Sequence, residues 1–221
     1  MSRISGLYAI YDHPYPFPLS PEEVVRAMLA DGVGARVIQL RAKRATHLEC
    51  LDLACRLGPI CAQADVPLVV NDDLRVATAG IEGVSGLHLG QRDLARVELA
   101  SLRTRLHEAG LLLGLSTHNL HQLGRASTAA PDYVAYGPVF PTRTKRCPGA
   151  VVGLASLAAA CRCARVPVVA IGGIDVSGAE QCVARCAQSI AVVGALVAAN
   201  PGKIRRQALR LARCFGEAVK R

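Results

Sequence analysis

The amino-acid sequence predicts a (β/α)8 TIM barrel, an α/β fold in which parallel strands alternate with helices and close into a ring. Two observations support this fold. Short apolar runs alternate with longer amphipathic stretches at roughly even spacing along the 221 residues. No linker or low-complexity segment divides the chain, so we expect residues 1–221 to form a single barrel domain. An open doubly wound sheet is the alternative, but the G-x-G-x-x-G pattern that would favour it after the first strand is missing.

The strand candidates are apolar runs that are too short for helices and that precede an amphipathic or polar stretch. They are Leu7–Tyr11, Arg36–Leu40, Pro67–Val70, Gly86–Leu89, Leu111–Leu115, Tyr133–Tyr136, Val166–Ile171 and Ser189–Val193. A barrel of this kind carries its functional residues at the carboxyl ends of the strands and in the loops that follow.

Helical periodicity fills the stretches between the strands. The first helix is expected over Pro21–Ala30, where Ser20 is the N-cap and Glu23 closes a capping box. Further helices are expected over residues with apolar positions at helical spacing: His47–Ala64, Leu94–Glu108 and Ser177–Ala187. The basic segment from Lys203 to Arg213 has the same spacing and is expected to be the solvated face of a terminal helix.

Composition excludes several classes of protein. Hydrophobic residues make up 51% of the chain, which argues against disorder. No apolar run reaches the length of about 18 residues that predicts a membrane span. Met1 to Pro18 has three prolines and lacks a basic region followed by an apolar stretch, so it does not resemble a secretory signal. We therefore expect a cytoplasmic protein without membrane partners.

The nine cysteines do not predict a disulfide framework or a zinc site. Their number is odd and no pair has C-x-x-C spacing. Several lie at helical positions, so we interpret the cysteines as small, reduced core or surface residues.

The net charge of +9 indicates an anionic ligand, either nucleic acid or a small molecule. The basic residues are mostly scattered, aromatic residues make up only 4% of the chain, and tryptophan is absent. Stacking platforms for single strands are therefore poorly supplied, and the pattern favours a small anionic substrate over nucleic acid.

The segment from Tyr133 to Lys145 is the most informative stretch of the chain. It runs from an apolar strand into a loop that carries Thr142, Arg143, Thr144 and Lys145. Hydroxyls, backbone N–H groups and cations in one loop suit a phosphate. Lysine is also scarce, because the chain has four lysines and 22 arginines. A solvated loop charge is the alternative interpretation of Lys145.

Polar residues follow the second strand with the period of a strand. Gln39, Arg41 and Lys43 alternate with Leu40 and Ala42, so their side chains should face one side near the barrel mouth. One amide and two cations there suit a polyanionic ligand, and a strand-end charge cluster is the alternative.

Carboxylates follow the third and fourth strands. Asn71, Asp72 and Asp73 end the third strand, and Asp93 follows the fourth. Two carboxylates beside cations and a phosphate suit Mg²⁺, which takes few protein ligands and fills its shell from phosphate and water. Helix N-capping competes with this interpretation, most strongly for Asp73.

The remaining strand ends offer hydroxyls, imidazoles and glycines. Ser116 can donate a hydrogen bond to a ligand, whereas His118 is either an acid–base group or a structural residue. His88 is more typical of a packed strand histidine. Gly172, Gly173 and Gly194 follow the seventh and eighth strands, where barrels commonly bind phosphate through backbone N–H groups.

Together these motifs resemble the thiamine-phosphate synthase family. The resemblance runs over nearly the whole chain, from Asp12 through the Gln39–Lys43 motif to the loop that ends at Lys145 and the Ala170–Ile174 motif. It implies an enzyme that joins 4-amino-2-methyl-5-hydroxymethylpyrimidine diphosphate to a thiazole phosphate. The implied products are thiamine phosphate and diphosphate.

The resemblance also implies a role for each matching residue. Catalysis falls to Lys145, Lys43, Arg41 and Ser116. The pyrimidine diphosphate is bound by Gln39, Leu40, Arg41, Ala42, Lys43, Asn71, Ser116 and Lys145. The thiazole phosphate is bound by Thr142, Arg143, Thr144, Gly172, Gly173, Val193 and Gly194. The implied cofactor is Mg²⁺, with Asp72 and Asp93 as its ligands.

One residue departs from the family pattern, because the family usually has serine where this chain has Gly194. The hydroxyl is lost and the backbone N–H remains, so we expect at most weaker binding of the thiazole phosphate. A related thiazole tautomerase is the nearest rival, although it should not need Lys43, Asp72 and Asp93 together. A non-catalytic phosphate- or nucleic-acid-binding barrel is a more distant rival. A homo-oligomer is left open.

Overall fold

The computed structural model describes residues 4–94, 97–142, 144 and 149–218. Eight parallel strands close into a barrel in the order β1 to β8, with β1 hydrogen-bonded to β8. The strands are β1 Gly6–Asp12, β2 Val37–Arg41, β3 Leu68–Asn71, β4 Val84–Leu89, β5 Leu112–Thr117, β6 Tyr133–Tyr136, β7 Val168–Ile171 and β8 Ser189–Val192. The predicted barrel is therefore confirmed, with strand bounds within two residues of those expected.

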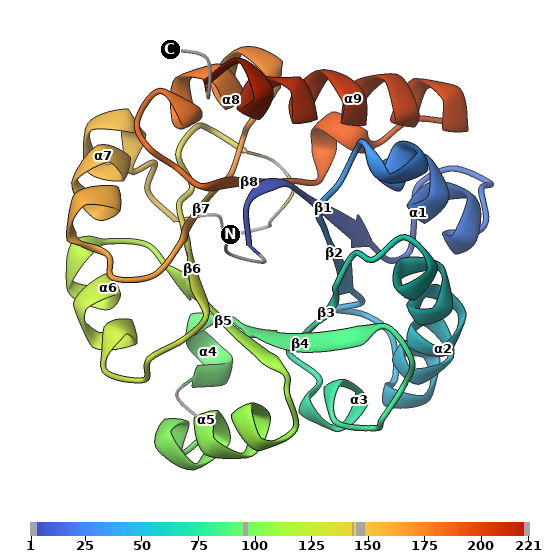
Figure 1. Ribbon diagram of the computed structural model, residues 1–221, viewed down its shortest axis with the longest axis horizontal. Helices are drawn as coiled ribbons and strands as arrows, with labels where there is room; N and C mark the ends of the chain where they lie inside the picture. Colours follow the sequence, from blue (N-terminus) through green and yellow to red (C-terminus); the bar gives the residue numbers. More distant parts are fainter. Residues whose placement is uncertain (1–3, 95–96, 143, 145–148, 219–221) are drawn as a thin grey trace.

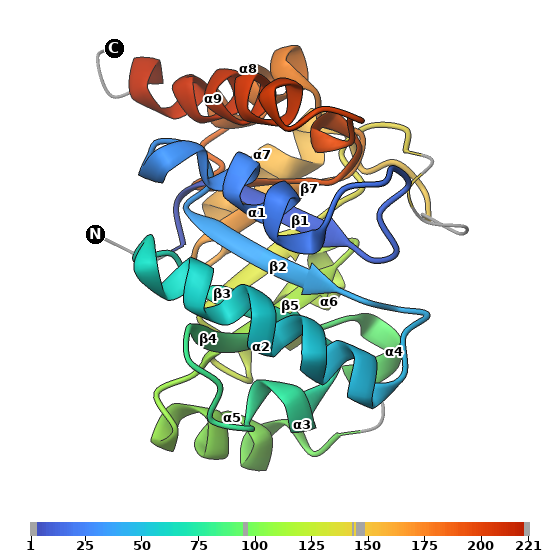
Figure 2. The ribbon, with the colours of Figure 1, turned by 90° about the vertical axis from the view of Figure 1, so that its right-hand side faces the viewer.

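Helices surround the barrel (Figure 1). They are α1 Pro21–Leu29, α2 His47–Gln63, α3 Leu74–Ala77, α4 Gln91–Leu94, α5 Leu99–Glu108, α6 Leu120–Ser127, α7 Gly153–Cys163, α8 Val176–Val183 and α9 Pro201–Ala218, with short 3-10 turns η1 Ala30–Gly32 and η2 Gly194–Leu196. Figure 2 shows β1 and β2 pointing toward the end of the barrel where α4 lies. No helix in these described ranges combines the length and apolar character needed to cross a membrane.

Side-chain hydrogen bonds to backbone N–H groups set the first residue of two helices, α1 and α5. The expected capping box of α1 is confirmed, since Ser20 and Glu23 exchange hydrogen bonds with each other's backbone N–H groups. The predicted helix over Leu94–Glu108 is wrong at its start. Its helix α5 begins at Leu99, because Glu98 has extended backbone and its carboxylate accepts the first N–H groups of the helix.

Two apolar layers hold the barrel. Outward-facing strand residues such as Leu7 and Leu40 pack against the helices in the larger layer. Alternate residues such as Tyr8, Val69 and Tyr133 point inward and form a smaller cluster within the barrel. Cys50, Cys61 and Cys182 are buried free thiols, in agreement with the interpretation of the cysteines as reduced core residues. The barrel interior is therefore filled, and the predicted site residues lie at its mouth.

Candidate active site

A cavity of about 390 Å³ opens at the carboxyl ends of the strands. The predicted residues that line it come from loops and strand ends around the whole barrel: Gln39, Arg41, Asn71, Ser116, Thr142, Thr144, Gly172, Gly173, Val193 and Gly194. A second, more open hollow of about 680 Å³ shares Asn71 with the cavity and is lined by Ala42, Lys43, Asp72, Asp73 and Asp93. The two hollows together bring most of the predicted site residues to one face.

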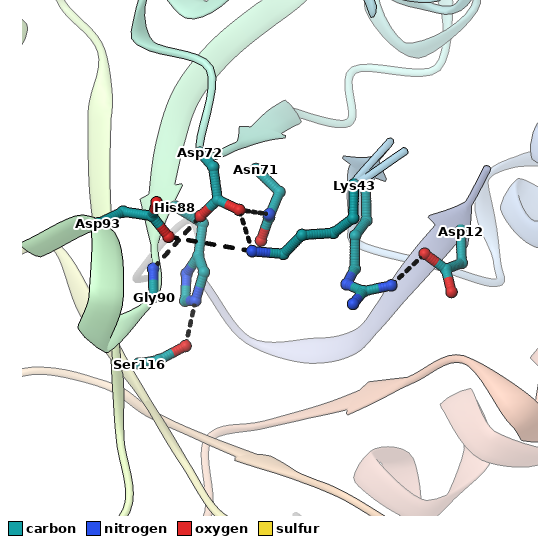
Figure 3. Close-up of polar contacts among 9 residues, drawn as sticks. Asp12, Lys43, Asn71, Asp72, His88, Gly90, Asp93 and Ser116 are labelled. Atoms are coloured by element: carbon teal, nitrogen blue, oxygen red, sulfur yellow. Dashed lines mark hydrogen bonds and ion pairs between the residues drawn. The ribbon is translucent and has the colours of Figure 1, made fainter. Parts of the chain in front are cut away.

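Lys43, Asp72 and Asp93 converge in the second hollow (Figure 3). The Lys43 ammonium forms an ion pair with Asp72 and lies 3.9 Å from Oδ2 of Asp93. Asn71 donates a hydrogen bond of 2.6 Å to Oδ2 of Asp72, and the Gly90 N–H lies 3.4 Å from Oδ1. Two carboxylates, one directly after β3 and one in α4, thus face the Lys43 ammonium.

This donor set fits Mg²⁺. The ion prefers oxygen ligands, needs only one or two carboxylates from the protein and takes the rest from phosphate and water. Asp72 and Asp93 would hold it. The described residues contain no group of three or more His, Cys, Asp or Glu side chains arranged to hold a metal, so the site does not resemble a structural zinc centre.

The Asp72 carboxylate is set for this role by its backbone and its charge. Its φ of 67° is left-handed, a conformation that aspartate tolerates better than most residues. Burial acts to raise the pKa of Asp72, but the hydrogen bond and charge of Lys43, together with hydrogen bonds with Asp93 and the Gly90 N–H, outweigh it, and the net pKa lies below the ordinary value. Asp72 is therefore ionised at neutral pH.

The neighbouring Asp73 has a structural role. Its Oδ1 accepts the Val76 N–H at 3.1 Å and caps α3, while its Oδ2 lies 2.8 Å from Nδ1 of His47. The expected competition between capping and metal binding is thereby resolved for this residue. Asp93 instead lies inside the short helix α4, so it is not an N-cap.

The polar residues that follow β2 divide between the two hollows. Gln39 and Arg41 line the cavity, and Lys43 lines the second hollow. Arg41 forms an ion pair with Asp12 at the end of β1. Leu40 is fully buried in the layer between barrel and helices, so its side chain cannot reach a ligand and only its backbone is available.

Ser116 lies on the cavity wall at the end of β5, 2.8 Å from Nε2 of His88. His88 is 5% exposed and packs against the Tyr133 ring, which confirms the interpretation of a packed strand histidine. His118 also lines the cavity, and its Nδ1 lies 2.5 Å from the Gly137 carbonyl oxygen. This contact fixes the His118 ring.

Glycines and hydroxyls form the wall opposite Asp72. Gly172 and Gly173 have φ values of 100° and 67°, and a Cβ at Gly172 would come within 2.5 Å of the Pro138 side chain. A Cβ at Gly194 would lie 3.9 Å from Oγ1 of Thr144, so a side chain fits there. Bare backbone and the Thr144 hydroxyl thus line one wall, which suits a phosphate.

Sequence reasoning missed two interior tyrosines that line the cavity, Tyr8 and Tyr133. Their alternation with outward residues along β1 and β6 is the signal that could have placed them there. Arg143 and Lys145, both predicted to bind substrate, lie outside the described residues.

The fold and the mouth define a (β/α)8 barrel with a polar cavity at the carboxyl ends of its strands. A family model described as thiamine monophosphate synthase matches residues 7–196. The chain therefore belongs to the thiamine-phosphate synthase family, whose members are transferases of thiamine biosynthesis.

Three relatives show how close this membership is. The thiamine-phosphate synthase of Neisseria meningitidis serogroup B is 41% identical over 170 residues, which cover 76% of this chain and 80% of the relative. That of Leptospira biflexa is 36% identical over 213 residues, or 95% and 98% of the two chains. The solved thiamine phosphate pyrophosphorylase of Pyrococcus furiosus superposes with a TM-score of 0.81 at 27% identity, covering 99% and 98% of the chains.

Proposed function

We propose that this chain joins 4-amino-2-methyl-5-hydroxymethylpyrimidine diphosphate to 4-methyl-5-(2-phosphooxyethyl)thiazole, giving thiamine phosphate and diphosphate with the help of Mg²⁺. The observation that carries the proposal is the convergence of Asp72 and Asp93 on Lys43, across the mouth from the glycine wall. Such a mouth can hold a metal-bound diphosphate and a phosphate at the same time.

The first step is departure of the diphosphate. The bond between the pyrimidine methylene carbon and the diphosphate oxygen breaks, and its electron pair leaves with the oxygen. Lys43 and Arg41 supply positive charge for the departing group, and the ion pair of Arg41 with Asp12 holds its guanidinium in place. When bound, Mg²⁺ would neutralise further negative charge on the diphosphate.

The second step joins the two rings. Positive charge that develops on the methylene carbon is quenched when the thiazole nitrogen donates its electron pair and forms the new C–N bond. Thr142, Thr144 and the backbone N–H groups of the glycine wall would hold the thiazole by its phosphate, so that the reaction becomes effectively unimolecular. No nucleophilic side chain is required.

The experiment is incubation of the pure protein with both substrates, with each one omitted in turn, and with either Mg²⁺ or a chelator. We expect thiamine phosphate and diphosphate in equal amounts, and only when both substrates and the metal are present. Absence of product in the complete mixture refutes the synthase proposal. Solvent-hydrogen exchange into the thiazole phosphate alone, without product in the complete mixture, would indicate a tautomerase instead.

A further inference from the structure

A chain of hydrogen bonds crosses the barrel interior along the wall of the cavity. Nε2 of Gln39 donates to the Tyr8 hydroxyl at 2.9 Å, and the Tyr8 and Tyr133 hydroxyl oxygens lie 2.7 Å apart. The Tyr133 hydroxyl lies 3.1 Å from Nδ1 of His88, whose Nε2 lies 2.8 Å from Oγ of Ser116. We refer to these five residues as the relay. It links β2, β1, β6, β4 and β5, and all five residues line the cavity.

The relay is buried, so a hydroxyl or N–H proton in it that lacks an acceptor would destabilise the fold. Tyr8 and Tyr133 are at most 1% exposed, and Gln39 and His88 are at most 5% exposed. A buried hydroxyl proton without an acceptor costs about 1–3 kcal/mol. Each donor in the relay must therefore find an acceptor within it or in the cavity.

This requirement sets the direction of every bond. Because the Tyr8 oxygen accepts from Gln39, the Tyr8 proton is donated to the Tyr133 oxygen, which lies 2.7 Å from the Tyr8 oxygen. The Tyr133 proton then goes to Nδ1 of His88, so the imidazole proton resides on Nε2 and is donated to Ser116. The Ser116 hydroxyl proton is left to point into the cavity.

The opposite direction changes what the cavity presents. If Ser116 donated to His88, His88 would donate to Tyr133 and Tyr133 would donate to Tyr8. The Tyr8 proton would then lack an acceptor unless the Gln39 amide were rotated to present its oxygen. The two ends of the relay are thus coupled. With Nε2 of Gln39 on Tyr8, the Gln39 carbonyl oxygen is an acceptor for a ligand and Ser116 is a donor.

We propose that Tyr8, Tyr133 and His88 are positioning residues, which hold Ser116 as a hydrogen-bond donor and thereby select a substrate ring that offers an acceptor to it. A ring nitrogen of an aminopyrimidine is such an acceptor, whereas the corresponding ring nitrogen of an oxopyrimidine carries a hydrogen and would be rejected. The identification of the ring rests on the proposed function. The direction of the relay does not.

The direct test is the tautomer of His88, read from ¹⁵N-histidine NMR of the full chain at neutral pH and assigned by comparison with His88→Gln. We expect the proton on Nε2 of His88. A proton on Nδ1, or on both nitrogens, overturns the proposal. This readout needs no substrate, so it stands or fails separately from the synthase activity.

A matched pair of tyrosines tests the positioning role. Tyr133→Phe interrupts the relay, whereas Tyr136→Phe removes a hydroxyl on the same strand that bonds with Ser156 on the helix side. We expect Tyr133→Phe to convert the single His88 tautomer into a mixture and to raise the KM for the pyrimidine diphosphate about fivefold. Tyr136→Phe should leave both unchanged. Identical His88 spectra and KM values for wild type and Tyr133→Phe overturn the proposal.

Discussion

The substitution Asp72→Asn isolates the charge of one proposed metal ligand. Asparagine has nearly the same shape as aspartate and tolerates the left-handed φ of 67° at this position. Its side-chain oxygen can still accept from the Gly90 N–H. The variant should therefore fold normally. It loses the negative charge that faces Lys43 and, because an amide has a single oxygen, the hydrogen bond that Oδ2 accepts from Asn71.

The contacts of Asp72 set the expected magnitudes. Its ion pair with Lys43 joins side chains that are 20% and 41% exposed, so its loss costs about 1 kcal/mol or less and lowers Tm by about 2–4 °C. Loss of one of two carboxylates for Mg²⁺ should weaken the apparent metal affinity by at least about tenfold. Removal of a group that stabilises the departing diphosphate should reduce kcat/KM by about 10²–10³-fold.

The assay is steady-state formation of thiamine phosphate as a function of Mg²⁺ concentration, with Asp73→Asn as the control. Asp73 lines the same hollow and carries the same charge, but it caps α3, and asparagine is an equally good cap. We expect the control to behave like wild type. An unchanged Mg²⁺ dependence in Asp72→Asn, or an equal loss in both variants, would refute the assignment of Asp72 as a metal ligand.

Three further outcomes are expected. Gly194→Ser should lower the KM for the thiazole phosphate about tenfold, because a side chain fits beside Thr144 and adds a hydroxyl for the phosphate; an unchanged or higher KM would contradict this. In acid unfolding, the stability advantage of wild type over Asp72→Asn should be present above pH about 4 and disappear as pH falls further, because the pKa of Asp72 is lower in the folded chain; an advantage that persists in acid would exclude a charge effect. Lys145→Ala should sharply reduce turnover without unfolding the protein, and near-normal turnover would disprove its role.

The sequence predicted the barrel well because its strands are buried on both faces and separated by periodic helices. The errors in the predicted bounds lie at the ends of helices and strands, where the contacts of a single side chain determine the first or last residue. Glu98 starts α5 by accepting its first N–H groups, and this local contact leaves only a weak mark on the apolar pattern.

The part of the site that could be predicted is the part that depends on strand order, because the carboxyl ends of all strands meet at one face of a barrel. The placement of Asp72 and Asp93 beside Lys43 followed from their positions after β3, β4 and β2. The relay could not be predicted, because contacts between Tyr8, Tyr133 and His88 depend on side-chain depth across the barrel. The loss of Leu40 as a side-chain contact could be predicted from the strand period alone.

Placement of the two anionic substrates on opposite walls of the mouth is tested most directly by calorimetric titration of each substrate alone, with Mg²⁺, into wild type and Asp72→Asn. We predict that Asp72→Asn weakens binding of the pyrimidine diphosphate by at least about tenfold and leaves the Kd of the thiazole phosphate unchanged. Equal weakening of both substrates, or of the thiazole phosphate alone, would contradict this division of the site.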